Sequence, residues 1–263
     1  MKRYFSIYRQ LLIVNYHRAL NHKADFLNGL FASIMWGVFS VLVVFILTSR
    51  SSSVFGWSRP ELFVLTGVFN ILIGGITRMF FSGNFDRFSH IVQYGELDGL
   101  LLKPLSSQFI LSFWYINYPN AVRIIFAVIF TIIALAFAHI PLTLLSTLFF
   151  IVLIVFGAIL MYSFWYLVMT FVIWFPDLYN LTELLYTTDN ITRYPPQILW
   201  TMRIGLFFIF FPLTLSVSVP TKVLLHTATI TDVALLISIS LGLLYLTKLF
   251  WNFALKYYSS ASG

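Results

Sequence analysis

The sequence predicts an all-α integral membrane protein with six transmembrane helices, an N-terminal interfacial helix and a short cytoplasmic helix between spans two and three. The chain has 263 residues, of which 60% are hydrophobic and only 10% are charged, whereas soluble domains carry about 25% charged residues. Twenty-nine phenylalanines, fourteen tyrosines and seven tryptophans enlarge the apolar surface. A water-soluble fold of this length could not bury so many apolar side chains, so lipid is expected to be the solvent for much of the chain.

Residues 1–24 are predicted to form an amphipathic helix that lies at the membrane interface. The basic start resembles a signal peptide, but Arg9, Gln10 and Asn15 interrupt the apolar core that such a peptide needs. On a helical wheel the apolar side chains share one face, and the basic and polar ones lie largely opposite. Residues 25–256 are then expected to form the six-span domain, and residues 257–263 a cytoplasmic tail.

Each predicted span is an apolar stretch of roughly 20 residues, the length that a helix needs to cross the hydrocarbon. The six stretches cover residues 26–48, 61–82, 116–138, 142 onward, 198–219 and 232–253. The fourth apolar run reaches residue 175 and is longer than one crossing requires. It indicates a tilted helix or a continuation along the membrane surface, and its inner end stays open.

The basic residues predict the orientation of these spans, because Lys and Arg stay on the cytoplasmic side. With the N-terminus inside, 13 of the 16 Lys and Arg residues fall on the inner side, and only Arg50, Arg59 and Lys222 fall outside. This pattern predicts a multi-pass protein of the inner (plasma) membrane with both termini in the cytoplasm. The lipid bilayer is therefore its first expected partner.

Several function classes are disfavoured by what the sequence lacks. The net charge of +7 is spread between the spans rather than gathered in one patch, which argues against nucleic acid. The five histidines are scattered without carboxylates at ligand spacing, which argues against a metal site, and the absence of cysteine excludes disulfides. No Gly is followed by Lys, so there is no Walker A loop, and no G-x-S-x-G stretch occurs. The chain is expected not to be an enzyme and to hold no cofactor.

Residues 84–104 interrupt the apolar pattern and are predicted to form one short cytoplasmic helix that Pro104 ends. Leu97, Leu100 and Leu101 give this helix an apolar side, and Glu96 and Lys103 lie near one another in projection. Glu96 and Asp98 would point about 200° apart, so they do not converge as an acid–base pair. The residues alone leave two interpretations equally open, a solvated loop helix and a docking surface with apolar anchors ringed by charges.

The stretch GELDGLLLKPLS resembles the cytoplasmic signature of ABC-2-type transporter permeases, in particular their six-span, daunorubicin-exporter-like branch. That signature is roughly G-x-L-D-x-x-L-x-x-P-L, and its residues are matched by Gly95, Leu97, Asp98, Leu101, Pro104 and Leu105. Three further stretches are similar to the family, in the same order along the chain: GWSRPEL at 56–62, residues 193–225, and the tail WNFALKYYSSASG.

The resemblance implies a role for the segment after span two. In such permeases it is a coupling helix, which sits in a groove of a separate ABC ATPase subunit. The resemblance also implies a homo- or heterodimer of permeases over two ATPase copies, with ATP and Mg in the partner and alternating access that moves substrate outward. The residues implied in ATPase coupling are Gly95, Glu96, Leu97, Asp98, Leu101, Lys103 and Pro104.

Two spans carry stripes of small and polar residues, each on one helix face. The stripe in span two comprises Thr66, Asn70, Gly74 and Thr77, and that in span five comprises Thr201, Gly205, Pro212 and Ser216. Such stripes mark helix–helix contacts or line a polar route, and both interpretations stay open. The resemblance places spans two and five at the dimer interface, and Pro212 is expected to kink span five.

Arg78, Arg123 and Arg203 lie near the predicted inner ends of spans. Their side chains are expected to reach the cytoplasmic headgroups, and the binding of an anionic substrate headgroup is the alternative.

Rival functions also stay open. An ion-coupled secondary transporter would need buried ionisable residues in midspan, which the sequence does not indicate, and a non-transporting membrane scaffold needs no such site. An intramembrane enzyme lacks a convergent catalytic set. For an exporter, the apolar and aromatic spans suit an amphipathic substrate such as a lipid, glycolipid, peptide or drug.

Overall fold

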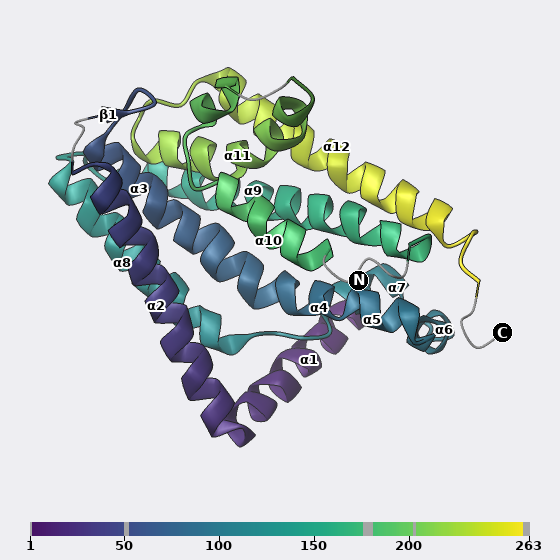
Figure 1. The fold of residues 1–263 in the computed structure, drawn as a ribbon. Coiled ribbons are helices and arrows are strands. Elements are labelled where there is room, and N and C mark those ends of the chain that lie inside the picture. The colour runs from purple at the N-terminus through teal and green to yellow at the C-terminus, as the bar shows by residue number, and fades with distance from the viewer. Residues whose placement is uncertain (1, 50–52, 176–180, 202–203, 260–263) are drawn as a thin grey trace.

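The computed structural model describes residues 2–49, 53–175, 181–201 and 204–259, without the side chains of residues 200–208, and helices dominate it (Figure 1). Five helices in this described part are long and apolar enough to cross a membrane. They are Lys23–Leu47, Arg59–Gln93, Tyr118–Phe137, Leu144–Ile173 and Ile230–Ala254. A helical membrane protein is thereby confirmed. The fifth predicted span, residues 198–219, overlaps α11 (Ile204–Leu224). The part of α11 whose side chains are described is a shorter apolar helix, Ile209–Leu224, so the count of six stays a prediction.

The N-terminal residues form α1 (Lys2–Asn21), which meets α2 (Lys23–Leu47) at a bend around His22 (Figure 1). Part of the apolar face of α1 packs on protein, because the Tyr4 ring lies edge-on to Phe109, at 5.1 Å between centroids. Phe109 belongs to α7 (Ser107–Phe113). The Asn15 amide donates to the Trp114 carbonyl at 3.0 Å, so a polar residue that disfavoured a signal peptide helps to dock the helix.

The second span is the central helix of the bundle. In its most apolar stretch 78% of the residues are buried, against 22% for α2 and 17% for α12 (Ile230–Ala254), whose outer faces are left for lipid. It starts as α3 (Arg59–Phe69), after a two-residue hairpin of β1 (Ser53–Val54) and β2 (Trp57–Ser58). The Ser58 and Glu61 side chains cap its first turn.

The second half of this span is a π-helix, η1 (Asn70–Ser82). Such i→i+5 segments are rare, usually short, and frequent at functional sites. Gly74 and Gly75 lie in η1 against α8 (Ala121–Phe137), where a Cβ would overlap the side chains of Arg123 and Ile124. The two glycines therefore let α8, which follows the short η2 (Tyr118–Asn120), pack closely on η1.

The long fourth apolar run forms α9 (Leu144–Thr170), which continues as η3 (Phe171–Ile173). The next described helix, α10 (Leu181–Ile191), lies alongside α9 and the second span (Figure 1). The sequence predicted no helix over these residues. The stretch is short and polar, and its buried residues Leu185, Thr188 and Asp189 lie on one face of the helix. Next come η4 (Pro196–Thr201) and α11.

The prediction of one helix over residues 84–104 is wrong. The segment forms three short helices, α4 (Gly83–Asp86), α5 (Phe88–Gln93) and α6 (Glu96–Leu101). The break before α6 lies at Gly95, whose φ of 70° is left-handed and cannot continue a right-handed helix. Figure 1 shows α5 and α6 at the same end of the bundle as both termini, opposite the β1 hairpin.

Candidate functional site

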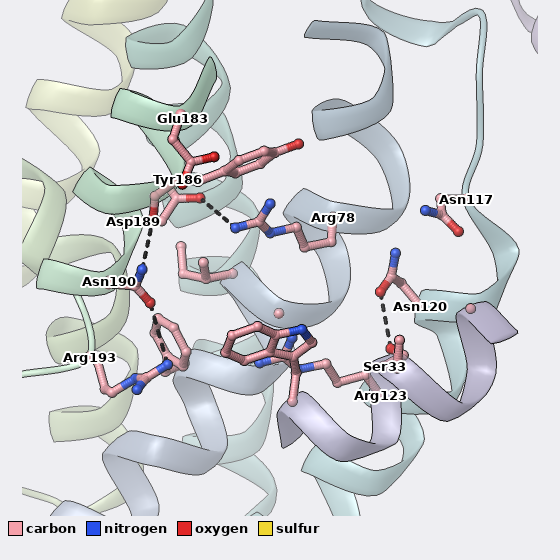
Figure 2. Close-up of a pocket in the computed structure, with 16 residues that line it drawn as sticks. Ser33, Arg78, Asn117, Asn120, Arg123, Glu183, Tyr186, Asp189, Asn190 and Arg193 are labelled. Atoms are coloured by element: carbon pink, nitrogen blue, oxygen red, sulfur yellow. Dashed lines mark hydrogen bonds and ion pairs between the residues drawn. The ribbon is translucent and has the colours of Figure 1, made fainter. Parts of the chain in front are cut away.

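A polar cavity of about 430 Å³ lies between α2, η1, the start of α8 and α10 (Figure 2). Three arginines line it, Arg78 from η1, Arg123 from α8 and Arg193 from the turn after α10. The carboxylates in the lining are Glu183 and Asp189, both from α10. We call this space the arginine cavity. Its guanidinium groups outnumber its carboxylates, and they come from elements far apart in the sequence.

Arg123 is held inside the bundle by a neutral side chain. It is only 8% exposed, and its Nε and Nη2 atoms donate to the Asn70 Oδ1 atom at 2.9 and 2.7 Å. The Asn70 amide in turn donates to the Ser40 hydroxyl at 2.6 Å and to the Thr66 carbonyl at 2.8 Å. The expectation that Arg123 reaches the cytoplasmic headgroups is therefore wrong. Asn70 accepts its hydrogen bonds, and the bare backbone of Gly74 leaves the guanidinium its room.

Arg78 lies against α10 (Figure 2). Its guanidinium carbon is 3.7 Å from the centroid of the Tyr186 ring, a cation–π distance, and its Nη2 atom is 3.9 Å from the Asp189 Oδ2 atom. The Tyr186 hydroxyl donates to the Asp86 carboxylate in α4 at 2.7 Å. Arg78 and Tyr186 thus connect the wall of the cavity to the segment that leads to α6.

Asp189 is a buried carboxyl group at the back of this arrangement. It is 1% exposed, and its Oδ1 atom accepts from the Trp165 indole at 2.9 Å. Burial raises the pKa of Asp189 to about 7, although Arg78 and the Trp165 hydrogen bond act to lower it. The sequence indicated no buried ionisable residue in midspan. Asp189 and Arg123 are both buried, but Asp189 lies on α10 and Arg123 in the first turn of α8, so neither is in midspan.

Arg193 lies beside Phe69, with its guanidinium carbon 4.9 Å from the ring centroid. Its Nη2 atom donates to the Asn190 Oδ1 atom at a long 3.4 Å. Among the described residues, neither the Arg193 Nε atom nor the Asp189 Oδ2 atom has a hydrogen-bond partner, although both are buried. Buried polar atoms normally have a partner, so this part of the cavity wall retains donor and acceptor capacity for a ligand.

The stripe predicted in span two contributes unequally to the arginine cavity. Gly74 lines it, and Asn70 and Thr66 form the hydrogen-bonded support of Arg123. Thr77 is fully buried, and its hydroxyl has no partner within the described chain. The charged cavity residues that the sequence did not indicate lie on or just after α10, where the signal was weak because the stretch is short and polar.

Of the stripe predicted in span five, the two residues that the structure describes in full, Pro212 and Ser216, do not line the arginine cavity. Pro212 lies inside α11, and the Ser216 hydroxyl donates to the Leu213 carbonyl at 2.6 Å. The Ser216 carbonyl packs against Gly157 of α9, where a Cβ would come within 2.7 Å of it, so this position serves helix packing. Thr201 and Gly205 belong to η4 and α11, but their side chains lie outside the described residues.

The second candidate site is α6 with the turn that follows it. Leu97 is fully buried and fastens α6 to the core, so it has no surface to offer a partner. Leu101 is 39% exposed and Leu102 is 87% exposed. Leu102, which sequence analysis did not include, is therefore the most accessible apolar side chain here. The helix ends at Leu101, three residues before Pro104.

The charged side chains of Glu96 in α6 and Lys103 in the turn after it do not contact one another as the helical projection suggested. Glu96 lies 3.9 Å from the His90 ring nitrogen, and Lys103 lies over the Trp114 ring at 4.9 Å, so Glu96 and Lys103 do not pair. In the C-terminal tail, burial and then the neighbouring Asp98 carboxylate raise the pKa of Tyr258. The tail therefore lies close to α6.

These features first define a class, a multi-pass helical membrane protein with a charged internal cavity and an exposed helix at the end that holds both termini. The chain belongs to a family of ABC-2 transporter proteins, because the family model described as ABC-2 family transporter protein matches residues 34–262. No curated protein and no solved structure matches the chain. The family match confirms the resemblance and makes the chain an ABC transporter permease, a membrane transport subunit of a kind that normally works with an ABC ATPase.

Proposed function

We propose that this chain is the membrane-spanning permease subunit of an ATP-driven exporter, and that α6 with Leu102 docks on the ABC ATPase. The family match supports the first part. The second part is carried by one observation, that Leu97 anchors α6 in the core while Leu101 and Leu102 stay exposed beside it. Exposed apolar anchors next to charged groups are typical of docking surfaces.

The proposed transmission runs through packed elements. Leu97 belongs to the same buried core as Phe85 of α4 and Phe88 of α5, and α4 continues directly from η1, which lines the arginine cavity. A push on α6 is therefore expected to move η1 and the cavity wall together. We propose that two permeases, identical or different, work over two ATPase copies that hold ATP and Mg. Alternating access would then move an amphipathic substrate outward from the cytoplasmic side of the plasma membrane. In this orientation α1 lies at the headgroup level.

Affinity purification from native membranes tests the proposal. A tag on this chain is expected to recover an ABC ATPase in comparable amount, identified by mass spectrometry, and proteoliposomes with both subunits are expected to transport only with ATP. Recovery of the chain without any ABC ATPase would count against the proposed function. A complex whose ATPase activity responds to no substrate would favour the non-transporting scaffold.

An ion-coupled transporter is the second candidate, and Asp189 is the observation in its favour. A buried carboxyl group whose pKa is raised to about 7 loses its proton as the pH rises through neutrality, as a proton-coupled site requires. This function predicts transport by the chain alone in nucleotide-free liposomes under a pH gradient, and loss of that transport in Asp189→Asn. For the ATP-driven exporter, we expect no nucleotide-free transport and unchanged ATPase recovery with Asp189→Asn.

Gly95→Ala is expected to weaken ATPase recovery several-fold while the bundle stays folded. An alanine at φ 70° is strained by roughly 1–2 kcal/mol, so the turn would relax and tilt α6. The matched control is Gly99→Ala in α6, where a Cβ meets nothing within 4 Å and alanine favours the helix. Pull-down with gel filtration of both variants checks this, and equal recovery for the two would remove the role of the Gly95 turn.

A further inference from the structure

We infer that the arginine cavity binds the phosphate group of an anionic amphiphile, with the apolar body of that ligand lying along α2. The inference rests on the proposed function only in taking the ligand as cargo, because binding itself needs no ATPase. Phosphate is the group that converging arginines suit best, since each planar guanidinium can donate two parallel hydrogen bonds to its oxygens.

The cavity has more positive than negative groups, which is the first reason to expect an anionic ligand. Arg123 is more than nine-tenths buried, and among the described residues its hydrogen-bond partner is the neutral Asn70 amide. An amide orients a guanidinium without neutralising it, and a buried cation needs a counter-charge. The lining offers two carboxylates for three arginines. One of those two, Asp189, is inclined by its burial to be protonated near neutral pH. A bound anion would supply the missing negative charge.

The second reason is that several guanidinium N–H groups around the cavity have no hydrogen-bond partner in the described structure. Within the described chain, the Nη1 atom of Arg123 makes no hydrogen bond. Arg78 has the 3.9 Å approach to Asp189, its stacking on Tyr186 and the charge of the nearby Asp86, but its guanidinium has no partner within hydrogen-bond distance among these residues. The Arg193 Nε atom is also without a partner there. Guanidinium donors of three elements are thus available around one space of about 430 Å³. That volume accommodates a phosphate head with part of its backbone.

The third reason is that the side of the cavity formed by α2 carries exposed aromatic side chains. Trp36 lines the cavity and is 58% exposed, and its ring lies edge-on to Phe39, which is 51% exposed, at 5.8 Å between centroids. Ser33 and Gly29, about one and two turns earlier on α2, also line the cavity. A polar space that borders the lipid-facing side of a span suits a ligand with a charged head and an apolar body. A free phosphate would contact only the polar, arginine-lined part of this surface and not the aromatic side chains of α2.

Binding to the purified full-length chain in nanodiscs of phosphatidylcholine tests the inference. Dioctanoyl phosphatidic acid is expected to bind at least tenfold more tightly than dioctanoylglycerol, which has the same tails without the phosphate, and at least tenfold more tightly than inorganic phosphate. Equal binding of the two amphiphiles would overturn the phosphate assignment. Inorganic phosphate binding as tightly as phosphatidic acid would overturn the amphiphile assignment.

Variants assign the binding to this cavity. Arg78→Gln and Arg193→Gln are each expected to weaken phosphatidic acid binding about tenfold and to leave the weak dioctanoylglycerol binding unchanged. The matched control is Arg59→Gln on α3, whose arginine stacks on Phe45 away from the cavity and whose loss is expected to leave affinity unchanged. An equal loss in the Arg59 variant would show non-specific charge attraction and overturn the site. Phosphate-dependent binding without ATPase recovery would contradict the proposed function alone, and ATPase recovery without such binding would contradict this inference alone.

Discussion

Replacing Leu101 and Leu102 together with aspartate is expected to remove the ABC ATPase from the purified complex and to leave the bundle folded. Burying one leucine fully contributes roughly 1.5–3 kcal/mol. Losing two such anchors would therefore weaken docking by about a hundredfold or more. The bundle tolerates the change because both side chains are already partly or largely exposed, at 39% and 87%. The measurement is the amount of ATPase recovered per permease.

Two controls sharpen this experiment. Leu20→Asp places one such aspartate at an exposed leucine of α1, away from α6, and is expected to keep wild-type recovery. Glu96→Lys, which reverses a half-exposed charge beside the leucines, is expected to weaken docking less than the double variant does. Wild-type recovery of the ATPase with the double variant would show that α6 is a solvated loop helix, the interpretation that the sequence left open.

Asn70→Leu is expected to lower the stability of the bundle by about 3 kcal/mol, because it removes the hydrogen-bond acceptor of a buried charge. The leucine has the same branching and the same number of side-chain heavy atoms, although its methyl groups are larger. The main effect is expected from the unpaired Arg123 guanidinium and the lost bonds to Ser40 and Thr66. For a chain of this size the change corresponds to roughly 6–12 °C in the unfolding midpoint. Gel filtration after heating the detergent-solubilised protein measures it.

A double-mutant cycle separates the charge from the packing. Asn70→Leu combined with Arg123→Met is expected to recover at least half of the lost stability, because the unpaired cation is gone. Thr247→Val is the matched control, since it removes the buried hydroxyl that donates to the Ser163 carbonyl at 3.1 Å and touches no charge. It is expected to cost about 1 kcal/mol. Additive effects of the Asn70 and Arg123 substitutions would contradict the coupling between these side chains.

Most of the span boundaries could be predicted from the sequence. The first span, predicted over residues 26–48, is Lys23–Leu47, and the last, predicted over 232–253, is Ile230–Ala254. Whether about 20 successive residues can lie in hydrocarbon depends only on their own side chains, which is a local property. The family resemblance was equally accessible, because its motifs are contiguous stretches of the chain.

The candidate sites depended on contacts that contiguous stretches do not contain. The helical pattern over residues 84–104 allowed one helix, but the structure breaks it at Gly95. The burial of Leu97, Phe85 and Phe88 in one core then fixes the orientation of α6. Likewise, α10 is too short and polar to be stable by itself. Its place comes from Trp165 and Asp86, which bond its Asp189 and Tyr186 side chains.

By itself the sequence determined that this is a helical membrane protein of the ABC-2 transporter family, because apolar length and contiguous motifs are local. Only the tertiary structure decided which way the buried Arg123 side chain points. Arg123 near the end of a span can reach lipid headgroups or turn inward, and the two outcomes differ by the partners available to it. Asn70 and Gly74, some fifty residues away in the chain, supply the acceptor and the space, and the guanidinium therefore faces the cavity.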